Sequence, residues 1–199
     1  MPKQSRPTKS NYMKTQNYFL AMIALAMLIM ATSNADARIW RVNKNSNYTG
    51  TSLWGDNLGG SAAYPVFKEV NQAVSWGTVM DGDTIHVEGA TGIYVDATIT
   101  KRLVIIGPGY FLNDNPKTSN LGLTADINRV DFITGSSGSI IIGMNNIYGS
   151  SSNDRININT SNITVKRCRM ERGVNITTGL NSIVIDQCFF DDTYPTFPV

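Results

Sequence analysis

The fold is decided by a nine-residue segment that occurs three times: SIIIGMNNI at residues 139–147, NITVKRCRM at 162–170 and SIVIDQCFF at 182–190. The segments align without gaps at steps of 23 and 20 residues. Three columns of this alignment are apolar throughout: Ile140, Ile163 and Ile183; Ile142, Val165 and Ile185; Ile147, Met170 and Phe190. A spacing of two is the period of a β-strand, and the change of spacing after the second column predicts a corner. Each segment is therefore expected to be a bent pair of short strands.

A further short strand is predicted before each segment, at residues 130–132, 156–158 and 174–176. A unit of about 20 residues with two or three short strands cannot bury its apolar side alone. Copies of the unit are therefore expected to stack, with parallel strands and a shared core. The alternatives are an antiparallel sandwich and a chance match within an aperiodic β domain. A sandwich would need hairpin turns such as Asn-Gly or Asp-Gly, and the repeat region contains none. The pattern favours a right-handed parallel β-helix, in which Ile140, Ile163 and Ile183 lie one above another.

The first 37 residues have the features of an export signal. Basic residues precede an uncharged run at 18–31, and Ala35-Asp36-Ala37 has the small-x-small pattern that a signal peptidase accepts. Cleavage is predicted between Ala37 and Arg38. A membrane anchor is the other interpretation, but the run is shorter than the roughly 20 residues that span a bilayer. The mature chain is thus expected to be secreted or at the cell surface, with no membrane span after cleavage.

The charge balance excludes one class of partner. Removal of residues 1–37 takes away four basic residues and one acidic residue, and leaves 13 Lys and Arg against 14 Asp and Glu. The excess of positive charge in the full sequence therefore belongs to the signal. Since the mature chain has no basic stretch, nucleic acid is not an expected partner.

The first part of the mature chain, residues 38–80, differs from the repeats. A strand is predicted at 39–42, and apolar residues at helical spacing predict one amphipathic helix over 64–74. Two strands are predicted to follow, at 85–87 and 102–107. Beyond them the chain carries β signals only.

Four segments of the mature chain form a recognisable set: FKEVNQAV at 67–74, DGDTIHV at 81–87, GIY at 92–94 and LVIIG at 103–107. With them the chain, over residues 38–199, resembles the pectin-lyase-like, right-handed parallel β-helix family as it occurs in exported bacterial surface proteins. The resemblance implies an all-β solenoid in which a helix caps the first coil and a Gly-Asp-Thr-Ile strand begins the stack. The coils are expected to occupy 81–199 and to continue past Val199, since no second cap follows the last repeat.

The family includes polysaccharide lyases, so the resemblance also implies candidates for catalysis. Such enzymes hold Ca²⁺ against a uronate with acidic residues and abstract a proton with Lys or Arg. The candidates are Lys166 and Arg167 as the base and Asp186, Asp191 and Asp192 as metal ligands. An exposed ion pair between Lys166 and Asp186 is the alternative, and the family's signature around the catalytic arginine is not present in the sequence.

Cys168 and Cys188 occupy one column of successive repeats. Their Cα atoms are therefore expected about 4.8 Å apart, the spacing of neighbouring strands. That spacing permits a disulfide, which export would allow. It equally permits a ladder of buried thiols, since free cysteine packs as a small apolar residue.

The sequence predicts a secreted or cell-surface β-helix module that presents a carbohydrate- or surface-binding face, without a complete active site in this stretch. Candidates for a sugar-stacking surface are Trp54, Tyr94, Tyr110 and Phe111, with packing of loops on the coils as the alternative. The competing interpretation is a polysaccharide-degrading enzyme, either a Ca²⁺-dependent, pectate-lyase-like lyase or a glycoside hydrolase, whose catalytic coils lie beyond residue 199. No cofactor is expected except Ca²⁺ in that second case.

Overall fold

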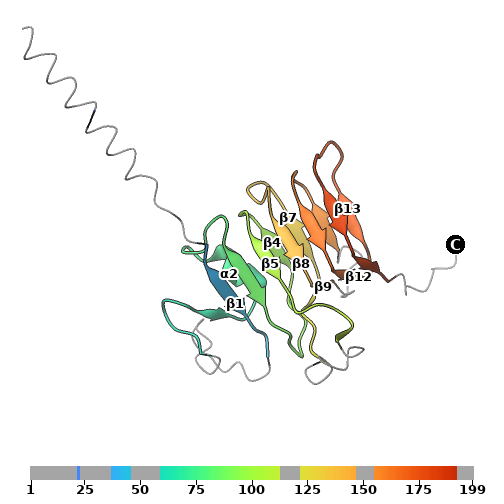
Figure 1. Ribbon diagram of the computed structural model, residues 1–199. Helices are drawn as coiled ribbons and strands as arrows, with labels where there is room; N and C mark the ends of the chain where they lie inside the picture. Colours follow the sequence, from blue (N-terminus) through green and yellow to red (C-terminus); the bar gives the residue numbers. More distant parts are fainter. Residues whose placement is uncertain (1–21, 23–36, 46–58, 113–121, 147–154, 192–199) are drawn as a thin grey trace, which may run out of the picture. The chain divides into compact units, whose positions relative to one another are not determined.

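The computed structural model describes residues 22, 37–45, 59–112, 122–146 and 155–191 (Figure 1). The chain divides into two compact units, 1–36 and 37–199, and the described strands belong to the second. The predicted export signal lies almost entirely outside the described residues. Among the residues that the structure describes, no helix combines the length and the apolar character that a bilayer crossing needs.

The described strands form three sheets, and every pairing between them is parallel. Sheet A has the order β14 (Val184–Asp186), β11 (Thr164–Lys166), β8 (Ile140–Ile142), β5 (Val104–Ile106), β3 (Thr84–Val87), β1 (Ile39–Val42) and β2 (Val66–Phe67). Sheet B has the order β15 (Phe189–Phe190), β12 (Arg169–Met170), β9 (Asn145–Asn146) and β6 (Asp126–Ile127). Sheet C has the order β13 (Val174–Ile176), β10 (Ile156–Ile158), β7 (Val130–Phe132) and β4 (Ala97–Ile99).

The order in which the chain visits the sheets is cyclic. From β5 onward each strand of sheet A is followed by one of sheet B and then one of sheet C, so every circuit adds one strand to each sheet (Figure 1). The predicted all-β fold with parallel sheets is confirmed. The strands predicted at residues 130–132, 156–158 and 174–176 are β7, β10 and β13.

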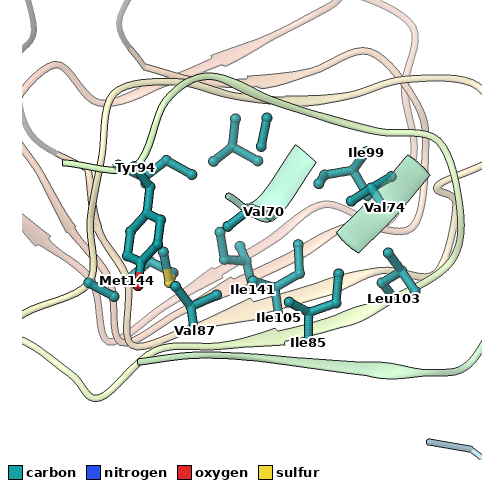
Figure 2. Close-up of a cluster of buried hydrophobic side chains, with 14 of the residues drawn as sticks. Val70, Val74, Ile85, Val87, Tyr94, Ile99, Leu103, Ile105, Ile141 and Met144 are labelled. Carbon is teal, nitrogen blue, oxygen red and sulfur yellow. The ribbon is translucent and has the colours of Figure 1, made fainter. Parts of the chain in front are cut away.

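One hydrophobic core collects buried side chains from all three sheets. One column of sheet A is buried in register across five strands and consists of Trp40, Ile85, Ile105, Ile141 and Val165, each at most 1% exposed. Figure 2 shows Ile85, Ile105 and Ile141 pointing into the same interior as Val70 and Val74 of helix α2 (Val70–Ser75). Each such side chain contributes about 1.5–3 kcal/mol when it is fully buried.

The inward columns become exposed at the last described strands. Ile185 is 39% exposed and Phe190 is 53% exposed, whereas Val165 and Met170 one coil earlier are fully buried. The reason is that no described strand lies on the far side of β14 and β15.

One step of the predicted alignment is wrong by one residue. Strand β8 pairs with β11 so that Ile141 lies beside Val165 and Ile140 beside Thr164, which is a step of 24 residues and not of 23. Ile141 is fully buried, whereas Ile140 is partly exposed. Because side chains alternate between the two faces of a strand, the shift moves Ile140 out of the core. The second step, of 20 residues, is as predicted.

Ser139 takes the inward position that the alignment gave to Ile140. It lies one residue before β8, as Ile163 lies one residue before β11, and it is fully buried. Its hydroxyl accepts a hydrogen bond from the N–H of Leu103 (3.0 Å) and donates one to the carbonyl oxygen of Lys101 (3.2 Å). A polar side chain is tolerated in this column because both of its hydrogen bonds are made.

Helix α2 is shorter than predicted. Val66–Phe67 form the strand β2, which pairs with β1, and only Val70–Ser75 are helical. The apolar face of the predicted helix is nevertheless buried, since Phe67, Val70 and Val74 are at most 2% exposed.

The helix protects one edge of sheet C. Strand β4 is the outermost strand of that sheet, and α2 packs against it. The N–H of Val95 donates to Oε2 of Glu69 (3.0 Å), and the N–H of Thr98 donates to Oδ1 of Asn71 (3.4 Å). Side chains at the start of the helix thus bind backbone groups that a further strand would otherwise bind, which blocks pairing with another chain.

Candidate functional site

Lys166 and Asp186, two of the predicted site residues, lie opposite each other on β11 and β14. The Nζ of Lys166 is 2.8 Å from Oδ2 of Asp186, and the two side chains are 37% and 43% exposed. This is the exposed ion pair that was the alternative to a catalytic role. Such a pair contributes less than about 1 kcal/mol, and it occupies the amine that proton abstraction would require.

Arg167, the other predicted base, lies at a corner of the coil. Its backbone has a positive φ of 50°, and the residues at the same corner of the neighbouring coils, Gly143 and Gln187, have φ values of 66° and 53°. Since the left-handed conformation recurs on three coils, it belongs to the corner and not to a strained catalytic residue. The Nε of Arg167 donates a hydrogen bond to Oε1 of Gln187 (2.8 Å).

The predicted metal ligands are not brought together. Asp186 pairs with Lys166, and Asp191 pairs with Arg169. Asp192 lies outside the described residues. Over residues 37–45, 59–112, 122–146 and 155–191, no group of three or more His, Cys, Asp and Glu side chains is placed to hold a metal ion.

Three aromatic rings meet beside the last described coil, and we call them the aromatic patch: Tyr110, Phe111 and Phe189. The centroid of the Phe111 ring lies 5.0 Å from the centroids of both others, and Tyr110 stacks on Phe189 at 6.3 Å. Phe111 is 45% exposed and Phe189 is 39% exposed. The hydroxyl of Tyr110 donates to the carbonyl oxygen of Gln187 (3.3 Å), which fixes the loop after β5 against the later coil.

A row of polar side chains leads up to Phe189 on the face of sheet B that points away from the core. This polar row consists of Asp126, Asn145 and Arg169, which occupy successive rungs, and Phe189 takes the next rung. The Nδ2 of Asn145 donates to Oδ1 of Asp126 (2.6 Å), and Nη1 of Arg169 donates to Oδ1 of Asn145 (3.5 Å). Asn145 is only 4% exposed, so the row presents Asp126 and Arg169, which are partly exposed, to solvent.

A cleft of about 340 Å³ follows the polar row at the corner between sheets B and C. It is lined by Arg155, Met170, Glu171, Arg172, Gly173, Phe190 and Asp191. The Nη2 of Arg169 is 3.3 Å from Oε1 of Glu171 and 2.5 Å from Oδ2 of Asp191, so one guanidinium joins the row to two carboxylates of the cleft. Charged groups around an apolar floor suit a ligand that has both hydroxyl groups and an apolar face.

Two residues of the cleft, Arg155 and Gly173, are neighbours in one column of sheet C. The residues before β7, β10 and β13 stand in this column and are Arg129, Arg155 and Gly173. Two coils place an arginine there, and the third places a glycine. The φ of Gly173 is 77°, a left-handed conformation that glycine adopts without strain.

Cys168 and Cys188 are both free thiols in one column with Met144. Cys168 is fully buried and Cys188 is partly exposed. A side-chain hydrogen bond from Cys168 lowers the pKa of Cys188 to about 6, whereas the same bond, together with burial, raises the pKa of Cys168. The disulfide and the thiol ladder both stay predictions.

Sequence reasoning found part of this site. It proposed Tyr110 and Phe111 for a sugar-stacking surface, and the structure adds Phe189 to them. Phe189 had a signal, because a residue between two inward positions must face outward. Tyr94 is fully buried and cannot stack on a ligand, and Trp54 lies outside the described residues.

The chain was compared with protein-family models, curated proteins and solved structures, and none of them matches.

Proposed function

We propose that this chain is an exported, right-handed parallel β-helix that binds polysaccharide on the outer face of sheet B. The cyclic order of the sheets and the purely parallel pairing support helical winding. The right hand follows from the strong preference of parallel crossovers. Export is supported by the signal pattern of the first 37 residues.

The observation that carries the binding proposal is the meeting of the aromatic patch with the polar row. The C–H faces of pyranose rings are apolar and pack on aromatic rings, while their hydroxyl groups bind planar polar side chains. Phe111 and Phe189 offer exposed rings, and the guanidinium of Arg169, which pairs with Glu171 and Asp191, lies one rung from Phe189. Exposed apolar groups beside fixed polar ones are typical of a binding surface.

Affinity electrophoresis tests this proposal. The full chain is run through gels that contain neutral polysaccharides (xylan, β-glucan) or acidic ones (polygalacturonate, alginate). We expect retardation in at least one gel, and we expect Phe189→Ala or Phe111→Ala to weaken binding roughly tenfold or more, as the loss of a central aromatic contact does. Tyr64→Ala is the matched control, because Tyr64 is 65% exposed and lies next to β2 at the opposite end of sheet A.

Two results contradict the proposal. One is the absence of retardation in all four gels. The other is equal binding by Phe189→Ala, Phe111→Ala and Tyr64→Ala, since the aromatic patch would then have no part in recognition.

A second candidate function, polysaccharide cleavage, is favoured by the carboxylates of the cleft. Glu171 and Asp191 both line it and both contact Nη2 of Arg169. Glycosidases use two neighbouring carboxyl groups in such a cleft. If the chain is a hydrolase, its incubation with polysaccharide should produce new reducing ends, and the variants Glu171→Gln and Asp191→Asn should not produce them. If it is a lyase, unsaturated products should form only when Ca²⁺ is present. If it is a binding module without activity, neither product should form, although the polysaccharide gel still retards the chain.

A further inference from the structure

We propose that Cys168 and Cys188 act as a dithiol that small-molecule disulfides oxidise to an intramolecular disulfide, with Cys188 as the attacking thiol. The product would join the last two described coils by a covalent bond across two parallel strands. This inference concerns a chemical modification and does not depend on polysaccharide binding.

The register of the strands places the two sulfur atoms together. Lys166 pairs with Asp186 on β11 and β14, and Arg169 pairs with Phe189 on β12 and β15, so the cysteines between them are neighbours on adjacent rungs. In-register neighbours of a parallel sheet have Cα atoms about 4.8 Å apart, within the range of about 4.4–6.8 Å found in disulfides.

The surroundings of the two sulfur atoms are alike. The Sγ of Cys168 lies 3.3 Å from the carbonyl oxygen of Lys166 and 3.9 Å from that of Ile141. The Sγ of Cys188 lies 3.4 Å from the carbonyl oxygen of Asp186 and 3.5 Å from that of Val165, which are the equivalent atoms one coil later. Both side chains therefore point the same way, on adjacent rungs of the stack.

The difference in exposure sets the order of reaction. Cys168 is fully buried, whereas Cys188 is partly exposed because no described strand covers β14 and β15. The hydrogen bond from Cys168 stabilises the thiolate of Cys188 and lowers its pKa to about 6. Since the thiolate is the nucleophile, Cys188 is both the accessible sulfur and the reactive one at neutral pH.

The reaction proceeds in two exchange steps. The Cys188 thiolate attacks one sulfur of an external disulfide such as oxidised glutathione, which forms a mixed disulfide and releases one thiolate. The sulfur of Cys168 then attacks the Cys188 sulfur and releases the second thiolate, which takes up the proton that Cys168 gives up. Overall the protein loses two protons and two electrons, and the external disulfide gains both and becomes two thiols.

Peptide mapping of the full chain tests the proposal. Reduced protein is incubated with oxidised glutathione at pH 5–8, alkylated and digested without reduction. We expect a peptide pair linked through Cys168 and Cys188, with a rate that rises with pH at lower values than for an ordinary thiol, because the pKa of Cys188 is lowered. Cys168→Ser should retain glutathione on Cys188, because the second step is blocked. Cys188→Ser should stay fully reduced, because Cys168 is buried.

The oxidised wild type should also melt roughly 5–10 °C higher than the reduced form, since the bond closes a loop between coils. Two thiols that remain alkylatable after oxidation, or a bond only between separate chains, would overturn the proposal. Faster oxidation of Cys188→Ser than of Cys168→Ser would overturn the assigned order. The wild-type map decides the question even where a variant does not fold.

Discussion

Asp83 is a buried carboxylate that holds three segments together. It is 3% exposed and accepts hydrogen bonds from the indole N–H of Trp40 (2.7 Å) and the backbone N–H groups of Arg38 (2.8 Å) and Met80 (2.9 Å). Burial alone would raise the pKa of this carboxyl, but the three hydrogen bonds outweigh it and hold the pKa below its ordinary value. The ionised form is therefore the one that stabilises the fold.

The first prediction concerns this carboxylate. Asp83→Ala should lower the free energy of unfolding at pH 7 by about 2–3 kcal/mol, because it leaves the buried indole N–H without an acceptor. A lowered folded pKa means that the stabilisation is present above the unfolded pKa of about 3.9 and is lost as pH falls through the folded value. Urea unfolding from pH 7 to pH 2 should thus show the difference from wild type shrinking below about pH 4.

Asp81→Ala is the control for Asp83→Ala, because Asp81 is exposed and accepts only from the N–H of Arg102 (3.0 Å). It should change stability by less than about 1 kcal/mol. An equal loss in both variants, or a loss in Asp83→Ala that does not depend on pH, would contradict the role given to Asp83.

The second prediction distinguishes two adjacent isoleucines. Ile141 is fully buried and Ile140 is partly exposed. Ile141→Ala should lower the free energy of unfolding by about 2–5 kcal/mol, whereas Ile140→Ala should lower it by less than about 1 kcal/mol. Chemical denaturation of both variants measures this. A larger loss of stability in Ile140→Ala than in Ile141→Ala would support the alignment predicted from the sequence and would contradict the observed pairing of β8 with β11.

At the scale of the element, sheet C carries a ladder of polar side chains. Asp131, Asn157 and Asn175 stand on successive rungs of β7, β10 and β13. The Nδ2 of Asn157 donates to Oδ1 of Asp131 (2.6 Å), and the Nδ2 of Asn175 donates to Oδ1 of Asn157 (3.2 Å). Each amide is thus a donor to the rung before it, so the ladder ties three strands in one register.

The third prediction tests that ladder. Asn157→Asp should lower stability by about 1–2 kcal/mol, because a carboxylate cannot donate and is placed opposite Asp131. High salt should recover part of the loss, since it screens the repulsion. Asn157→Ala is the control, because it loses the hydrogen bonds without adding charge and should show no recovery with salt. A loss in Asn157→Asp that salt does not reduce would argue against the opposed carboxylates.

At the scale of the whole molecule, export is the fourth prediction. Protein collected outside the producing cells should begin at Arg38, because Ala35-Asp36-Ala37 has the small-x-small pattern that a signal peptidase accepts. N-terminal sequencing of the secreted form measures this. Ala37→Phe should block cleavage and leave the longer form on the cells. A chain that stays in the cytoplasm with residues 1–37 intact would contradict export.

Much of the architecture was predictable from the spacing of apolar residues, whereas the exact register and the site were not. The run Ile140-Ile141-Ile142 does not indicate which of its side chains face the core, because every position in it is apolar. Ser139 was unexpected in the core, since only the structure shows the partners of its hydroxyl. In the aromatic patch Tyr110 contacts Phe189. The sequence near Tyr110 does not predict this contact, because nothing in it indicates that the loop after β5 extends to the last described coil. The cleft is lined by residues of two sheets, and their proximity follows only from the pairing of the strands.

Methyl NOE spectroscopy of isotope-labelled protein tests the stacking of coils most directly. Parallel strands in the observed register place Ile141 between Ile105 and Val165. We therefore expect NOE contacts from the methyl groups of Ile141 to those of both neighbours, and none between Ile140 and Ile163. Contacts between Ile140 and Ile163, or the backbone contacts of an antiparallel pair between β8 and β11, would contradict the stacked coils in this register.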